Sequence, residues 1–243
     1  MRLSRCAAVL VLASVSAVAA EAGIPEKIAN RLDQVVTPSE PDEFQGRFTM
    51  SITTVVQKPN GKSREVVAFD ADVELAADGS RTRRLLRYFE NGEDVTEEQR
   101  EEFEGADRSS KKNDGDDDDS DLANPFGDTA GLYRFGEPEN NGAEVTITFE
   151  PAPGHEEDHN VARGRLAWDP VTQEPKWMEM TAVHAPKPLR SLSIRLEFRP
   201  QGDDIFVSRM VTDGLARVLM MQREFHMDLR FEDIQPAGAP AEK

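Results

Sequence analysis

The chain has 243 residues, and 46 Asp and Glu against 29 Lys and Arg give it a formal net charge of −17. With 38% hydrophobic residues it can bury one sizeable core, and a chain of this length favours a single domain. Proteins bind nucleic acids and anionic membrane surfaces through clustered Lys and Arg side chains. The acidic composition therefore argues against both classes of partner.

The first twenty residues have the pattern of a secretory signal peptide. Arg2 and Arg5 precede an uncharged apolar run over 6–20, and Ala17-Val-Ala-Ala20 offers a small-residue cleavage site before Glu21. The run is shorter than the ~20 residues that a membrane-spanning helix needs. We therefore expect export to the periplasm or cell envelope, with a cleavage that leaves no transmembrane segment.

The only cysteine, Cys6, lies inside this segment. Its removal would leave a chain without a disulfide, a thiolate zinc site or a cysteine nucleophile. A thiol-free acidic chain suits a bacterial envelope compartment better than a disulfide-stapled extracellular module does.

The chain after the predicted cleavage site begins with a helix and continues in strands. Apolar residues from Ile24 to Val35 recur at helical spacing, which predicts a short amphipathic helix over 24–36. From Phe48 onward the hydrophobic period is two, as in strands with one buried face. Two-residue signals mark the turns between the first strands at Asn60-Gly61, Asp78-Gly79 and Asn91-Gly92.

An acidic segment interrupts the strand pattern. Thr96-x-x-Gln99 matches a capping box and predicts a short acidic helix over 97–104. Residues 107–121 are rich in Asp and hold no apolar side chain, so we expect a disordered insertion there. The run Asp114–Asp121 lacks the Gly and Glu positions of an EF-hand loop, which argues against a built calcium site.

The second half returns to strands. In 191–199 apolar and polar residues alternate completely, so one face of the strand is dry and the other wet. This pattern predicts a mainly β fold, a single large curved antiparallel sheet or half-barrel of about nine to eleven strands with the two short helices. The single domain would span 21–235, before a frayed tail over 236–243. The strands are predicted at 132–135, 143–150, 161–168, 176–184, 189–199, 205–212 and 215–233.

Several short segments occur along the chain in an order that can be compared with known protein families. They are Gln45-Gly-Arg-Phe48, Asn91-Gly-Glu-Asp-Val-Thr96, Gly164-Arg-Leu-Ala-Trp-Asp-Pro170 with Glu174-Pro175, Pro186-Lys-Pro-Leu189 and Phe231-Glu-Asp-Ile234. Together with the signal peptide and the first helix, this layout resembles the LolA-like superfamily of periplasmic lipoprotein carriers, in its lipoprotein-sorting-like branch. The resemblance implies a half-barrel of antiparallel strands closed by helices around a hydrophobic cavity for acyl chains. The Asp-rich insertion departs from that pattern.

The dry face of the predicted strands supplies the candidate ligand-binding residues. Methionine suits adaptable lipophilic surfaces, although it also fills gaps in ordinary cores. A half-barrel either fills its inner face with side chains or holds a ligand there. The residues expected to line a ligand cavity are Met50, Ile52, Phe69, Val73, Met178, Met180, Leu192, Ile194, Leu196, Phe198, Met221, Phe225, Met227 and Leu229.

One short motif offers a different chemistry. His155-Glu-Glu-Asp-His159 matches the H-E-x-x-H pattern of zinc metalloproteases, in which both histidines bind the metal and the glutamate activates a water molecule. Here the motif lies between two predicted strands with no apolar residue to seat a helix, so we expect an exposed loop. His155, Glu156 and His159 are therefore weak candidate metal ligands. The sequence carries no nucleophile elbow and no phosphate- or dinucleotide-binding motif, and we predict no cofactor.

These observations favour a non-enzymatic cell-envelope protein that binds a lipid, an acyl chain or an acylated protein on the inner face of its sheet, as a carrier does. Two alternatives stay open. One is an envelope scaffold or interaction protein whose cavity is filled by its own side chains. The other is a zinc-dependent hydrolase that uses the 155–159 segment.

Overall fold

The computed structural model describes residues 24–33, 35, 44–57, 64–76, 80–105, 122–126, 129–185, 187–201, 204–218 and 221–236. Several expectations from the sequence lie outside these residues. They are the signal peptide, the turns at Asn60-Gly61 and Asp78-Gly79, the acidic insertion over 107–121 and the tail beyond Pro236.

Strands make up most of the described chain. The helices are α2 (Glu26–Asp33) and α3 (Thr96–Gly105), with a 3₁₀ turn η3 (Ala130–Leu132). The strands are β1 (Phe44–Gln57), β2 (Arg64–Leu75), β3 (Arg81–Glu90), β4 (Glu93–Asp94), β5 (Tyr133–Phe135), β6 (Glu139–Asn140), β7 (Val145–Pro151), β8 (Ala162–Trp168), β9 (Pro175–Ala182), β10 (Leu189–Gln201), β11 (Asp204–Val218) and β12 (Met221–Pro236).

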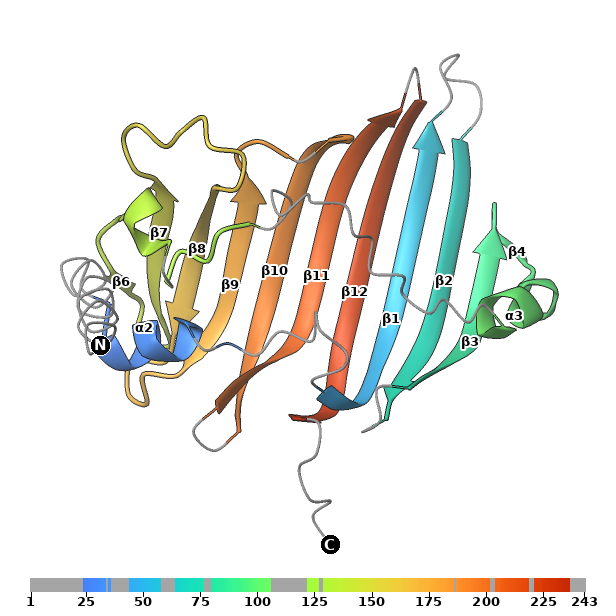
Figure 1. Ribbon diagram of the computed structural model, residues 1–243, viewed down its shortest axis with the longest axis horizontal. Helices are drawn as coiled ribbons and strands as arrows, with labels where there is room; N and C mark the ends of the chain where they lie inside the picture. Colours follow the sequence, from blue (N-terminus) through green and yellow to red (C-terminus); the bar gives the residue numbers. More distant parts are fainter. Residues whose placement is uncertain are drawn as a thin grey trace, which may run out of the picture. The chain divides into compact units, whose positions relative to one another are not determined.

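Backbone pairing joins these strands into one sheet of twelve, in the order β4-β3-β2-β1-β12-β11-β10-β9-β8-β7-β5, with β6 paired to β7. The first long strand, β1, pairs antiparallel with the last, β12, so that segments from opposite ends of the chain run side by side (Figure 1). The predicted fold class, mainly β with a large antiparallel sheet, an N-terminal helix and a short acidic helix, is confirmed. The strand number exceeds the prediction because β4 and β6 have two residues each, too few to show a period.

The boundary between the last two strands differs from the prediction. The sequence predicts a strand that ends at Thr212 and a new one from Leu215, because Asp213-Gly214 has the composition of a turn. In the structure β11 continues through both residues to Val218. Asp213 Oδ1 lies 2.8 Å from His226 Nδ1 on β12, and Gly214 lies opposite Phe225. Both residues therefore belong to the paired part of β11 and contact β12.

The chain divides into two compact units, which we describe separately. The first holds α2, the strands from β5 to β9 and residues 195–206. Ile28 and Leu32 on α2 are 0% and 2% exposed, and Lys27 and Arg31 on the same helix form ion pairs with Glu174. The helix predicted over 24–36 is thus confirmed over its central part and held in place by both apolar burial and charge.

The core of the first unit contains a cluster of aromatic rings. Phe149 packs edge-on against Phe126 and Tyr133, with ring centroids 5.9 and 5.8 Å apart, and all three rings are buried. The Tyr133 hydroxyl donates a hydrogen bond of 2.8 Å to the Ala123 carbonyl oxygen. Burial of this hydroxyl raises the pKa of Tyr133 above its ordinary value.

The second unit holds β1 to β4, α3, residues 186–194, most of β11 and β12. Its hairpin between β3 and β4 turns at Asn91 and Gly92, whose φ angles of 52° and 88° are both positive. This is the geometry of a type I′ turn, so the prediction of a turn at Asn91-Gly92 is confirmed.

Helix α3 lies against β3 (Figure 1). Side chains of the helix bond the backbone of that strand. The Leu85 amide donates to Glu104 Oε1 at 3.0 Å, and the Tyr88 amide donates to the Thr96 hydroxyl at 2.8 Å. The predicted acidic helix is confirmed, but Thr96 uses its hydroxyl for the strand rather than for a capping box with Gln99. These bonds cover part of a strand that would otherwise offer its amides to other chains.

Candidate functional site

One face of the second unit carries a continuous set of apolar side chains. In an antiparallel pair, residues directly opposite each other project from the same face. Met50 on β1 lies opposite Ala71 on β2 and Leu229 on β12, and Leu229 lies in turn opposite Met210 on β11. We call this set the apolar band: Phe48, Met50, Ile52, Phe69, Ala71, Val73, Met210, Phe225, Met227, Leu229 and Phe231.

The next rows of the ladder extend the band without interruption. Ile52 lies opposite Phe69 and Met227, and Phe48 lies opposite Val73 and Phe231. The rings of Phe48 and Phe231 lie 5.6 Å apart. Four strands therefore contribute to one surface.

Most side chains of the band keep part of their surface exposed. Ala71, Val73 and Phe231 are buried, at 0%, 3% and 6% exposed. The other members are half-buried, although several are long apolar side chains. A sheet face with this degree of exposure offers more apolar contact area than an ordinary core surface does.

The dimensions of the band follow from strand geometry. Along β12, the band extends from Phe225 to Phe231, which spans about 20 Å at ~3.4 Å per residue. Across β2, β1, β12 and β11 it spans about 14 Å at ~4.8 Å per strand. A bilayer core of ~30 Å holds two acyl chains end to end, so one chain needs about 15 Å. The band is long enough for one acyl chain.

The opposite face of the same strands is charged. Asp228 on β12 accepts two hydrogen bonds of 2.9 Å from Arg209 on β11, and Arg230 contacts the same carboxylate at 3.2 Å. Arg47 and Asp72 form another pair at 2.6 Å. The Arg209 hydrogen bonds lower the pKa of Asp228, outweighing the burial that raises it. The two faces of this unit thus differ sharply in polarity.

The predicted cavity residues divide between the two units. Those on β1, β2 and β12 belong to the apolar band, apart from Met221, which is half-buried near the start of β12. Met178, Met180, Leu196 and Phe198 belong to the first unit and are buried, at 6–8% exposed. Leu192 and Ile194 on β10 are half-buried. We therefore restrict the candidate site to the apolar band.

Four band residues were not among the predicted cavity residues: Phe48, Ala71, Met210 and Phe231. Tyr88, beside the band, was missed because β3 contains a bulge. Leu85 lies opposite Ala71 and Arg87 opposite Asp70, so Leu86 is an extra residue in the strand. The bulge returns Tyr88 to the apolar face, where its ring stacks on Phe69 with centroids 5.8 Å apart. The adjacent pair Leu85-Leu86 was the only local signal.

The histidine motif forms no helix. Residues 152–161 connect β7 to β8, as expected for a loop. His155 Nδ1 lies 2.8 Å from Asp158, whereas His159 packs edge-on against His184 at 5.7 Å between ring centroids. Glu156 accepts a hydrogen bond from the Gly154 amide. Within the described residues, no three His, Cys, Asp or Glu side chains are grouped so that they could hold a metal ion.

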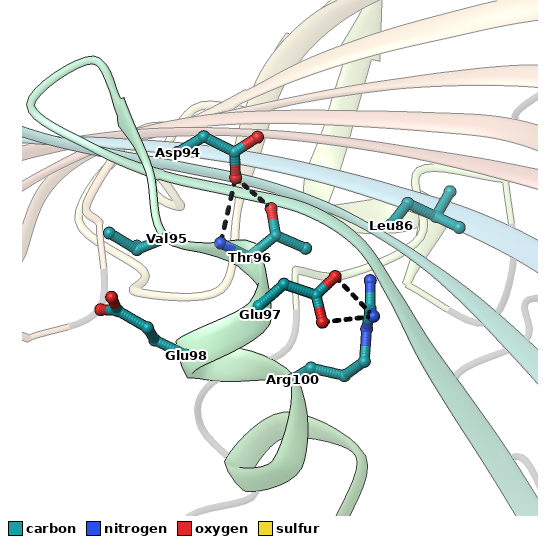
Figure 2. A pocket seen from close by; sticks show the side chains of 7 residues that line it. All are labelled: Leu86, Asp94, Val95, Thr96, Glu97, Glu98 and Arg100. Carbon is teal, nitrogen blue, oxygen red and sulfur yellow. Dashed lines mark hydrogen bonds and ion pairs between the residues drawn. The ribbon is translucent and has the colours of Figure 1, made fainter.

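A separate pocket of about 450 Å³ lies where β4 leads into α3 (Figure 2). Asp94 accepts hydrogen bonds from the Thr96 hydroxyl and amide, and these bonds lower the pKa of Asp94. Arg100 pairs with Glu97 at 2.8 Å. The pocket is thus lined mostly by polar side chains, and four of these are bonded in the pairs Asp94–Thr96 and Glu97–Arg100. The lining residues are Leu86, Asp94, Val95, Thr96, Glu97, Glu98 and Arg100. An acyl chain would find few apolar contacts in this pocket.

Comparisons with known proteins found structural similarity alone. No family model matches the sequence, and no curated protein matches it. None of the helices that the structure describes is both long and apolar enough to cross a membrane.

The solved structures that are similar to this chain include the following three. A proposed outer membrane lipoprotein-sorting protein domain from Vibrio parahaemolyticus has 11% identity and a TM-score of 0.31, with 89% of this chain and 93% of that chain covered. A DUF1329 family protein from Desulfovibrio piger has 10% identity and a TM-score of 0.31, with 88% and 92% covered. Lipovitellin has 9% identity and a TM-score of 0.32, with 84% of this chain but 26% of that chain covered.

The lipoprotein-sorting proteins that the sequence resembles are represented among these structures by the Vibrio parahaemolyticus domain. Because the identities and the TM-scores are low, we base no functional inference on these three proteins.

Proposed function

We propose that this chain is a non-enzymatic cell-envelope protein that binds a lipid or acyl chain on the apolar band. The single observation that supports the proposal most is the exposure of the band. Side chains such as Met50, Ile52 and Met227 are half-buried on one face, while the face behind them carries bonded ion pairs. Covering apolar surface of this kind is favourable, at roughly 25 cal/mol per Å².

The composition of the band suits an acyl chain. Met50, Met210 and Met227 are unbranched and flexible, so they adapt to a ligand that itself has many rotamers. The aromatic members, such as Phe225, add large contact areas. On the band face, the three opposed pairs of β1 and β12 at Phe48, Met50 and Ile52 are all uncharged, so the ligand would not have to desolvate an ion there.

The experiment measures binding of an apolar fluorescent dye and its displacement by a fatty acid. Replacing Ile52 with Glu places a carboxylate in the centre of the band and should weaken binding by about tenfold or more, because an unpaired charge is costly to cover. Thr53 projects from the opposite face, next to Ala68 and His226 on the neighbouring strands. The Thr53→Glu variant is therefore the matched control and should bind as the wild type does.

A milder variant guards against loss of folding. Met227→Gln keeps a long side chain but adds an amide to the band, and should weaken binding by several-fold while leaving the melting temperature nearly unchanged. Equal binding by the wild type and both band variants would refute the proposal. So would a wild-type protein that takes up neither dye nor fatty acid.

A further inference from the structure

The apolar band ends at an arginine. On β12, Arg223 lies two residues before Phe225 and therefore projects from the same face as the band. Arg223 is exposed, whereas the band residues are half-buried or buried. Arg223 thus continues the row formed by Leu229, Met227 and Phe225, and Met221 lies beyond it on the same face.

The residues directly opposite Arg223 are neutral. They are Val56 on β1 and Ala216 on β11. Glu65 on β2 projects from the same face one strand beyond Val56, and it forms no ion pair with Arg223. Diagonally on the same face lie Thr54 and Gly214, the residues opposite Phe225. Within the described part of the chain, Arg223 takes part in no ion pair.

Three arginines on the opposite face of these strands pair with carboxylates. Arg47 bonds Asp72 at 2.6 Å, Arg209 bonds Asp228 at 2.9 Å, and Arg87 bonds Asp70. All three project from the charged face. In a chain with a net charge of −17, carboxylate partners are plentiful, yet Arg223 pairs with none among the described residues.

From this placement we infer that the ligand is a single-chain lipid with an anionic head group, and that Arg223 binds the head group. The inference rests on the proposed function. An arginine binds carboxylate or phosphate oxygens through its planar set of N–H donors. An acyl chain that starts at Arg223 and follows β12 passes Phe225, reaches Met227 after about 14 Å and Leu229 after about 20 Å.

Two arginines of β3, Arg81 and Arg83, also project from this face, and Arg81 lies opposite Leu75, beyond the band. Arg83 on β3 lies opposite Val73, at the side of the band rather than at its end. Two residues further along β3, the Leu85 amide bonds the Glu104 carboxylate, so α3 brings negative charge to this strand. An anionic head group is therefore less favourable beside Arg83 than beside Arg223.

The test compares dodecanoate with 1-dodecanol, which have the same chain length and differ in head-group charge. Binding is measured by displacement of an apolar dye from the wild type and from Arg223→Gln at mildly alkaline pH. We expect the wild type to prefer the acid by about two- to fivefold, as for an exposed ion pair, and the preference to fall with added salt. Arg223→Gln should bind both molecules equally, at the affinity that the wild type has for the alcohol.

Two control variants complete the test. Arg217 lies on the same end of β11 but projects from the opposite face, opposite Gln222, so Arg217→Gln should keep the preference for the acid. Arg83→Gln should keep it as well. The inference is overturned if Arg223→Gln retains the preference, if either control loses it, or if the wild type binds acid and alcohol equally. Absence of binding for both molecules would instead refute the proposed function.

Discussion

The ring of Phe225 lies across Gly214 on the neighbouring strand, where a Cβ atom would come within 2.2 Å of two ring carbons. Gly214 thus provides the space in which this ring rests on the sheet. Phe225 belongs to the apolar band and lies between Arg223 and Met227. A glycine in β11 therefore fixes the position of a candidate binding residue on β12.

Replacing Gly214 with Ala should displace the Phe225 ring. We expect a loss of about 1–3 kcal/mol in the free energy of unfolding, as for overpacking elsewhere, together with altered dye binding. Thermal denaturation and dye titration measure the two effects. Gly131→Ala is the control, because its Cβ would meet no atom within 4 Å. An unchanged melting temperature for Gly214→Ala would show that the ring does not depend on the glycine.

Gly164 in the first unit should tolerate replacement even less. A Cβ at this position would lie 1.9 Å from the Glu179 carbonyl oxygen and 2.5 Å from the Phe149 ring. A backbone oxygen within the β8–β9 ladder cannot move aside as a ring can. We expect Gly164→Ala to lower the melting temperature more than Gly214→Ala does, and the reverse order would contradict this account of the two contacts.

Thr96 should stabilise the junction of β3 and α3 through its hydroxyl. The hydroxyl accepts from the Tyr88 amide at 2.8 Å and donates to Asp94, and Thr96 is 8% exposed. Thr96→Val keeps the shape but leaves the amide and the carboxylate without this partner, at a cost of about 1–3 kcal/mol in the free energy of unfolding. Thr96→Ser should recover most of the loss. Equal stability of the valine and serine variants in urea denaturation would refute the role of the hydroxyl.

Asp228 should make stability depend on pH. Hydrogen bonds from Arg209 lower the pKa of Asp228 in the folded state, so the carboxylate stabilises the fold above the unfolded value of ~3.9. This contribution is lost as the pH falls through the lowered folded pKa. Asp228→Asn should therefore be less stable than the wild type by about 1 kcal/mol at neutral pH, and the difference should shrink below pH ~4. A difference that is constant across the acid range would contradict this prediction.

The sequence predicts the strands well because their alternation is a local property. The strands β1, β2 and β10 were predicted from their period of two. The turn at Asn91-Gly92 was predicted because Asn and Gly tolerate the positive φ angles that this turn requires. The bulge at Leu86 was not recognised, since one extra residue reverses the alternation without changing the composition. Tyr88 was consequently left out of the predicted site.

The same alternation does not tell a core from a binding surface. Met178 and Met50 both lie on the dry faces of their strands, yet Met178 is buried and Met50 is half-buried. The difference arises from what packs over each strand, which comes from segments distant in sequence. Arg223 could be predicted to share a face with Phe225, but its neutral neighbours Val56 and Ala216 follow from the pairing of three strands.

The central claim, that the apolar band holds a lipid or acyl chain, is tested most directly by native mass spectrometry of the protein isolated from the cells that produce it. The account predicts a species heavier than the polypeptide by the mass of one acyl-bearing molecule, which denaturation releases and lipid analysis identifies. The Ile52→Glu variant, isolated in the same way, should carry little or none of it, while Thr53→Glu should carry as much as the wild type. A wild-type protein found only at the mass of its polypeptide, and unable to take up an added fatty acid, would contradict the claim.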